Sequence, residues 1–346
     1  MNSRKRVIRA VKFEEVDRVP VLPILLGYAA KLNNITYEMY GSDPHFLVMS
    51  LVKALKVHNL DGIYVSSHYV VAEALGCKTV YLADRIDQSP KQEDMVIQDS
   101  SDLDKLNNFD PSSHKSTMLI KKATEIAKGE LGNEYAIKTF IGSGPFSLAA
   151  MLRGMERIMF DLYDNEQLVY DLLDLCTNAV IKNANFLIGA KPDLFSFGDS
   201  TAGLIGRDLY KKYAFPFEKK LIEGIKKLGV PVFMHICGNT MHIVDIMAKT
   251  GADVLELDYQ DDLKECREIM GKDLGKIPAI QGNIDPVSRI MQGTPDEIYK
   301  ESTRLIKDLE GLKGGFILSP GCEVPPDTPG ENIDAMVKAS KENSYE

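Results

Sequence analysis

The 346-residue sequence has no long apolar run. No stretch reaches the roughly 18 apolar residues that a membrane span needs, and the basic residues near the start precede no uninterrupted apolar segment of the kind that directs export. A basic patch is also missing, and the formal net charge is −9, which disfavours nucleic acid and anionic membranes as partners. The five cysteines are therefore expected to be thiols in a cytoplasmic protein, not disulfides.

The sequence also lacks a glycine-rich dinucleotide fingerprint, internal repeats and low-complexity tracts. It contains instead short apolar runs bounded by turn signals, most of them followed by amphipathic stretches such as Asp208–Leu228, Met241–Thr250 and Pro295–Leu309. Eight alternations favour a closed (β/α)8 barrel over an open doubly wound sheet. The predicted strands are Val19–Leu25, Gly62–Val65, Ala136–Ile141, Leu194–Phe197, Val230–His235, Asp253–Leu257, Ile277–Gln281 and Gly315–Leu318.

One polar segment, residues 78–135, interrupts this alternation after the second predicted strand. Its turn-rich composition predicts a hairpin and a helix inserted at the rim of the barrel. Hydrophobic residues make up 44% of the chain and charged residues 26%, which is ordinary for a globular core. We therefore expect residues 1–346 to form one domain.

The strongest chemical signal is a strand that ends in His235 and Cys237. Residues two apart on a strand face the same way, so the imidazole and the thiol can share one metal ion. Cys322 follows the last predicted strand, and all strand ends of a barrel meet at one face. One histidine and two thiolates suit zinc and leave a coordination position open, as in a catalytic site. The alternative is that these are a core histidine and two buried thiols.

A fourth ligand is expected from one of two carboxylates at the end of the sixth predicted strand. Asp258 is slightly favoured over Glu256. Either residue could instead orient His235 by accepting its second ring N–H.

Several strings resemble the uroporphyrinogen decarboxylase superfamily and, within it, the zinc-dependent methylcobamide methyltransferases of the coenzyme M type. They are His235-Ile-Cys237-Gly-Asn, Gln281-Gly-Asn-Ile-Asp-Pro286, Ser319-Pro-Gly-Cys-Glu-Val-Pro-Pro-Asp-Thr-Pro-Gly-Glu-Asn332, Gly144-Pro-Phe-Ser-Leu-Ala149, Glu73-Ala-Leu-Gly-Cys77 and Gly198-Asp-Ser-Thr-Ala-Gly203. The decarboxylases bind substrate carboxylates with an arginine-rich segment, whereas residues 23–28 contain no arginine here, and His68 takes the place of the decarboxylases' aspartate. The resemblance therefore favours the methyltransferase branch over decarboxylation.

This resemblance implies that His235, Cys237 and Cys322 bind Zn²⁺ and that a thiol attacks the methyl group of a methylcobamide carried by a corrinoid-binding protein. Three alternatives stay open. They are transfer from a methoxy or methylamine donor to the corrinoid, tetrahydrofolate as the acceptor, and a noncatalytic corrinoid-handling role.

Further residues at the predicted strand ends are weaker candidates. Asp199, His68 and Asn283 are expected to contact or orient the substrate, or else to serve as helix-capping, core or turn residues. The turn Gly144, Pro145 and Phe146 is expected either to leave room for the flat corrin ring or to be only a tight turn.

Overall fold

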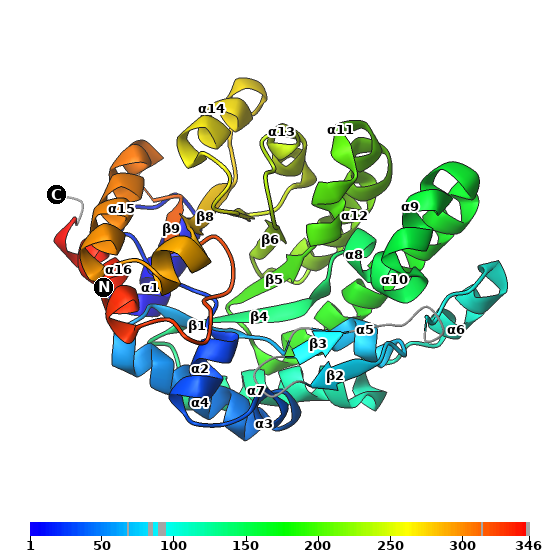
Figure 1. The fold of residues 1–346 in the computed structure, drawn as a ribbon, viewed down its shortest axis with the longest axis horizontal. Helices are drawn as coiled ribbons and strands as arrows, with labels where there is room; N and C mark the ends of the chain where they lie inside the picture. Colours follow the sequence, from blue (N-terminus) through cyan, green and yellow to red (C-terminus); the bar gives the residue numbers. More distant parts are fainter. Residues whose placement is uncertain (68, 82–85, 89–94, 313, 344–346) are drawn as a thin grey trace.

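A computed structural model describes residues 1–67, 69–81, 86–88, 95–312 and 314–343. Seven strands form one parallel sheet in which each strand pairs with the next along the sheet (Figure 1). In order they are β1 (Gly62–Val65), β4 (Ala136–Ser143), β5 (Leu194–Gly198), β6 (Val232–Ile236), β7 (Val254–Leu257), β8 (Ala279–Ile284) and β9 (Phe316–Pro320). Seven of the eight predicted strands thus lie within a few residues of their expected positions.

The eighth predicted strand, Val19–Leu25, is wrong as a strand. Within this fully described segment, Val21 forms one parallel bridge with Leu318 of β9, and the amide N–H of Asp61, just before β1, donates to the carbonyl of Val21 over 3.1 Å. Pro20 and Pro23 have no N–H group, so a regular ladder cannot extend through the segment. It still connects the two edge strands of the sheet, which gives the molecule a TIM-barrel-like fold.

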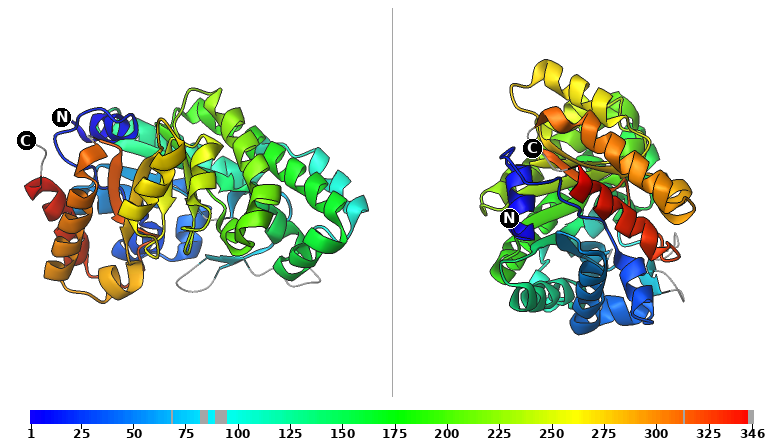
Figure 2. Two further views of the ribbon diagram at one scale, coloured as in Figure 1. Left: turned by 90° about the horizontal axis from the view of Figure 1, so that it is seen from above. Right: turned by 90° about the vertical axis from the view of Figure 1, so that its left-hand side faces the viewer.

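Helices form an outer layer around the strands (Figure 1). The predicted helix at Pro295–Leu309 is confirmed as α15, which begins with a capping box between Thr294 and Glu297. It packs beside α16, next to β9 (Figure 2). The longer helices are α4 (Pro44–His58), α7 (Lys115–Leu131), α8 (Pro145–Arg153), α9 (Met155–Asp164), α10 (Glu166–Leu187), α12 (Phe215–Lys226), α14 (Leu263–Asp273), α15 (Pro295–Asp308) and α16 (Gly330–Glu342). Among the described helices, none is both long and apolar enough to cross a membrane.

An N-terminal helix, α1 (Ser3–Val11), covers one end of the strands. Its buried side chains pack with residues at the amino ends of the strands in a separate apolar cluster: Val7, Ala10, Val11, Val16, Leu22, Ala136, Leu194, Phe233, Val254, Ala279 and Ile317. This cluster seals the amino-terminal end of the barrel. Any cavity that opens from the barrel interior is therefore expected at the carboxyl-terminal ends of the strands.

The segment between β1 and β4 contains an antiparallel pair, β2 (Thr79–Tyr81) and β3 (Ile86–Gln88), which lies outside the main sheet. The helix α7 at the end of this segment packs against α4 and α5 (Val70–Ala74), in the outer layer. Only the part before α7 therefore departs from the strand and helix alternation, and the predicted bounds of the insertion, 78–135, stay a prediction.

Candidate metal centre and cavity

Strand β6 and the turn after β9 bring together three side chains that could ligate a metal ion. The ligand atoms of His235, Cys237 and Cys322 all lie within 4.8 Å of one another. The Nε2 atom of His235 is 2.9 Å from the Sγ of Cys237, which is 3.9 Å from the Sγ of Cys322. The predicted convergence of these three residues is therefore present, although 85 residues separate the two cysteines.

Hydrogen bonds fix the orientation of two of these ligands. His235 Nδ1 lies 3.0 Å from the backbone carbonyl oxygen of Glu256, and because a carbonyl only accepts, Nδ1 carries the proton and Nε2 faces the thiols. The hydroxyl of Ser200 donates to the sulfur of Cys237 over 3.1 Å. The acceptor that orients His235 is thus a main-chain oxygen of Glu256, not the side chain of Glu256 or Asp258.

The donor set fits zinc. Zinc–thiolate bonds of about 2.3 Å in a tetrahedral site place two sulfurs about 3.8 Å apart, close to the observed separation of 3.9 Å. The Nε2 atom of His235 and the Sγ atom of Cys237 lie closer together than two ligands of one zinc ion would, because they form a hydrogen bond with each other. One imidazole and two thiolates would hold the ion and leave one position for a substrate atom.

His235, Cys237 and Cys322 also shift one another's pKa values. Burial, the largest single influence, lowers the pKa of His235, but the hydrogen bond and charge interactions with Cys322 and Glu256 together outweigh it and raise that pKa to about 9. The hydrogen bond from Cys322 lowers the pKa of Cys237, while the same bond and burial raise that of Cys322. The cluster therefore retains protons that a metal ion must displace when it binds.

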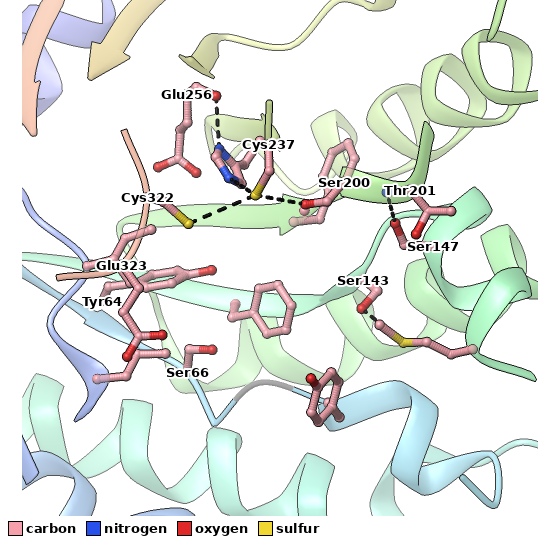
Figure 3. A pocket seen from close by; sticks show the side chains of 18 residues that line it. Tyr64, Ser66, Ser143, Ser147, Ser200, Thr201, Cys237, Glu256, Cys322 and Glu323 are labelled. Atoms are coloured by element: carbon pink, nitrogen blue, oxygen red, sulfur yellow. Dashed lines mark hydrogen bonds between the residues drawn. The ribbon is translucent and has the colours of Figure 1, made fainter. Parts of the chain in front are cut away.

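A cavity of about 380 Å³ opens beside the cluster. Figure 3 shows Cys237, Cys322 and Glu256 together, with Tyr64, Ser66 and Glu323 on a neighbouring part of the wall and Ser143, Ser147 and Thr201 farther along. Most of these residues lie at or just after the carboxyl ends of strands, where barrel enzymes carry their active sites. A metal ion at the cluster and a small substrate would share this space.

The expected fourth ligand, Asp258, does not join the cluster: among the described residues, the group of close ligand atoms contains only the histidine and the two cysteines. The Oδ1 atom of Asp258 accepts from the backbone N–H of Gln260 over 3.1 Å and so stabilises the turn after β7. Glu256 does line the cavity.

Glu256 forms a buried ion pair with Lys138 of β4 inside the barrel. The Nζ atom of Lys138 also lies over the ring of Tyr64, 4.5 Å from its centre, and Ser196 donates to the second oxygen of Glu256 over 3.2 Å. Burial lowers the pKa of Lys138. This pair was not predicted from the sequence. The lysine in the apolar run Ala136–Ile141 was a usable signal, because a charge inside a barrel requires a partner.

Asp199 is fully buried and lies at the amino terminus of α8. Its carboxylate accepts from the backbone N–H groups of Phe146 at 3.2 Å and Ser147 at 2.6 Å. Burial raises its pKa to about 6. Asp199 is not among the described residues that line the cavity, and it caps α8, not the helix that follows it in sequence.

The first testable prediction concerns this cap. Asp199→Asn removes one of two carboxylate acceptors at the helix terminus, so we expect a loss of about 1–2 kcal/mol in the free energy of unfolding and unchanged zinc content. The folded protein holds the Asp199 proton up to about pH 6, whereas the unfolded chain releases it near pH 4. The Asp199 carboxyl group therefore increases the free energy of unfolding of the wild-type protein as the pH falls through 6. Asp199→Asn lacks this effect, so its loss of unfolding free energy relative to the wild type should be about 1 kcal/mol larger at pH 5 than at pH 8. Urea unfolding at both pH values checks this, and an equal deficit at both would contradict it.

Gly144, Pro145 and Phe146 form the start of α8, with Pro145 in its first turn. A Cβ atom on Gly144 would lie 2.5 Å from the Asp199 side chain, so the close approach of that side chain accounts for the glycine. None of these three residues is among the described residues of the cavity wall. The residues that flank them in the sequence, Ser143 and Ser147, do line the cavity.

Asn283 lies apart from the metal cluster. Its Nδ2 atom donates to the backbone carbonyls of Asp258 at 2.8 Å and Asp261 at 2.7 Å, and so ties β8 to the turn after β7. The third predicted catalytic residue, His68, lies outside the described residues.

The hydroxyl-bearing part of the wall was not predicted. Ser143 and Ser200 lie two and three residues after predicted strands, and the rule that strand ends carry the site would have included them. Tyr64 and Phe140 lie inside strands, where an apolar or aromatic residue in sequence does not reveal whether it faces the cavity or the helices.

Comparisons with known proteins agree with the geometry. The family profile described as uroporphyrinogen decarboxylase (URO-D) matches residues 2–343. The chain is 33% identical to the methylcobamide:CoM methyltransferase MtbA of Methanosarcina acetivorans, over 99% of this chain and 98% of that protein. It is 26% identical to a uroporphyrinogen decarboxylase of a Synechococcus species, over 98% and 97% of the two chains. A solved methyltransferase from Methanosarcina mazei superimposes with a TM-score of 0.84 at 22% identity and 99% coverage of both chains, which supports the fold.

Proposed function

This chain belongs to the uroporphyrinogen decarboxylase family, and from that membership and its His–Cys–Cys cluster we propose that it is a zinc-dependent methyltransferase. The enzyme moves the methyl group of a methylcobamide to a small thiol. The relative at 33% identity is named for a reaction of this type.

The observation that carries the proposal is a soft ligand set at the wall of a cavity. A zinc site with only three protein ligands leaves one position for a substrate, and the cavity provides room for a small one. Decarboxylation of a substrate with many carboxylates would require several cationic side chains. Among the described residues of the wall there is no lysine or arginine.

His235, Cys237 and Cys322 would hold the ion, which when bound supplies a Lewis acid that lowers the pKa of the substrate thiol. The carbonyl of Glu256 keeps the imidazole of His235 directed at the ion. The hydroxyl of Ser200 donates to Cys237 and stabilises its thiolate form. The substrate thiol would release its proton to water, and its sulfur would bond to the methyl carbon. The carbon–cobalt bond would break with its electron pair remaining on cobalt, giving a methyl thioether and a cob(I)amide.

The remaining assignments are proposals about the same site. The corrinoid reaches the open end of the barrel on a separate corrinoid-binding protein, and residues 1–346 act as one domain with the β2–β3 hairpin at the rim. Asp199 acts as a positioning residue, because it fixes the start of α8 and with it Ser147. Asn283 positions the turn that carries Asp258. Asp258 would act as a fourth ligand only if its carboxylate gave up its hydrogen bond with the backbone N–H of Gln260. His68 is proposed to contact the substrate.

The second prediction tests the activity itself. Zinc-loaded protein incubated with methylcobalamin and a small thiol should convert the methylcorrinoid spectrum to that of cob(I)alamin, at a rate that depends on both zinc and thiol. Mass spectrometry should detect one methyl thioether per methylcobalamin consumed.

Two further measurements test decarboxylation and methyl transfer in the opposite direction. Uroporphyrinogen should not be decarboxylated above background, because the described residues of the wall include no lysine or arginine to bind its carboxylates. If no thiol accepts the methyl group but a methoxylated or methylamine donor methylates cob(I)alamin, the direction proposed for the transfer is wrong.

A further inference from the structure

Two of the five cysteines are accessible from the cavity. Cys237 and Cys322 are partly exposed and line its wall, whereas Cys77, Cys176 and Cys266 are buried. A thiol exchanges with an external disulfide only where that molecule can reach its sulfur. Thiol exchange in this protein is therefore expected at Cys237 and Cys322.

The sulfur atoms of these two cysteines lie close enough to bond to each other after a small movement. They are 3.9 Å apart, with no side chain between them along the line that joins them (Figure 3). The bond in a disulfide is about 2.05 Å long, so each sulfur has to move by about 1 Å, which a rotation of the two side chains can supply. The pair that could ligate a metal ion is thus also a pair that could form a disulfide.

The proposed methyl transfer brings a suitable oxidant to the same place. Every thiol acceptor RSH has an oxidised form, the symmetrical disulfide RSSR, in which the same group R occurs twice. The cavity of about 380 Å³ has room for such a disulfide when R is small. A site that admits the thiol beside Cys237 and Cys322 therefore also exposes both cysteines to its disulfide.

We propose that Cys237 and Cys322 form a redox-sensitive pair that the disulfide of the acceptor oxidises, an inference that rests on the methyl transfer proposed above for its choice of oxidant. The thiolate of one cysteine attacks RSSR, forms a mixed disulfide with one RS group and releases the other as RS⁻. The thiolate of the second cysteine then attacks the protein sulfur of the mixed disulfide, which forms the bond between Cys237 and Cys322 and releases the second RS⁻. Two electrons pass from the pair to RSSR.

The disulfide and the metal site exclude each other. A sulfur in a disulfide is no longer a thiolate, so oxidation leaves His235 as the one ligand of the cluster among the described residues, and a bound ion is released. An excess of the reduced acceptor reverses both exchange steps and restores the two ligands. The protein therefore keeps its metal only while the acceptor is mostly in its reduced form.

The test uses zinc-loaded full-length protein and bis(2-hydroxyethyl) disulfide, the oxidised form of 2-mercaptoethanol. A colorimetric chelator should detect the release of about one zinc ion per chain. The mass of the denatured chain should fall by about 2 Da, the two hydrogens of the thiols, and peptide mapping should find Cys237 joined to Cys322. An excess of 2-mercaptoethanol with added zinc should restore the original mass and zinc content.

Variants of the pair separate the two exchange steps. Cys322→Ser lacks the second thiol, so the reaction should stop at a mixed disulfide on Cys237 and the mass should rise by one RS group. Cys237→Ser should stop in the same way at Cys322. The matched control is Cys266→Ala, which removes a buried thiol on α14 and should form the disulfide as the wild type does. These covalent products are measured without reference to turnover.

The outcomes separate this inference from the proposed function. If the wild-type protein keeps its zinc, gains RS groups without an internal disulfide, or joins a different pair of cysteines, the redox pair is wrong while methyl transfer to thiols stands. If the disulfide forms as expected but no thiol accepts a methyl group from methylcobalamin, the proposed function is wrong and the pair is sensitive to disulfides for another reason.

Discussion

Cys322→Ala should strip the protein of zinc. The wild-type protein is expected to contain about one zinc ion per chain, and Cys237→Ala and Cys322→Ala to contain less than about a tenth of that after dialysis. The reason is geometric: the cluster has three ligand side chains among the described residues, and removing one leaves only two. Methyl transfer should fall with the metal.

Elemental analysis of the purified variants measures this effect directly. Cys266→Ala is the matched control, because Cys266 is a buried thiol on α14 outside the cluster and its loss should leave the zinc content unchanged. Thermal unfolding of all three variants distinguishes loss of metal from loss of fold. Full zinc content in both cluster variants would show that the metal binds elsewhere.

Lys138→Met should destabilise the fold by about 3–5 kcal/mol, because it leaves the carboxylate of Glu256 buried without its cation. Glu256→Gln should have a comparable cost, since the ammonium of Lys138 is fully buried. The double variant Lys138→Met/Glu256→Gln leaves no charge unpaired, and it should recover most of the loss.

Urea unfolding of the metal-free proteins gives these free energies. Lys121→Met serves as the control, because Lys121 pairs with Glu125 on the surface of α7 and such pairs contribute only a few tenths of a kcal/mol. If Lys138→Met lowers the free energy of unfolding no more than Lys121→Met does, the buried pair of Lys138 and Glu256 does not stabilise the barrel.

Strand positions were predictable because burial on both faces produces continuous apolar runs, as in Val232–Ile236. The run Val19–Leu25 is also largely apolar but does not form a strand. Its two prolines limit it to a single bridge, and a composition-based prediction gives too little weight to their missing N–H groups. The α1 helix below the barrel was not predicted either, because only its contacts with the strand ends reveal what it covers.

The proximity of the three candidate metal ligands was predictable for a different reason. Two ligands two residues apart on a strand must face the same way, and the barrel brings Cys322 to the same end. Asp199 and Asn283 also follow strands, yet both bind backbone groups, Asp199 at the start of α8 and Asn283 in the turn after β7. Sequence position places a side chain at the correct end of the barrel but does not specify whether it contacts a substrate or stabilises a loop.

The single bridge between Val21 and Leu318 has a consequence for how the molecule is made. The chain is synthesised from its amino-terminal end, so the bridge from Val21 to Leu318 can form only after β9 has been made. Cys322 follows β9 directly, which means that the last ligand of the metal cluster becomes available at the same stage as the last strand. The full set of candidate ligands therefore exists only once this segment has been made, and an ion bound there would cross-link β6 to the segment that completes the barrel.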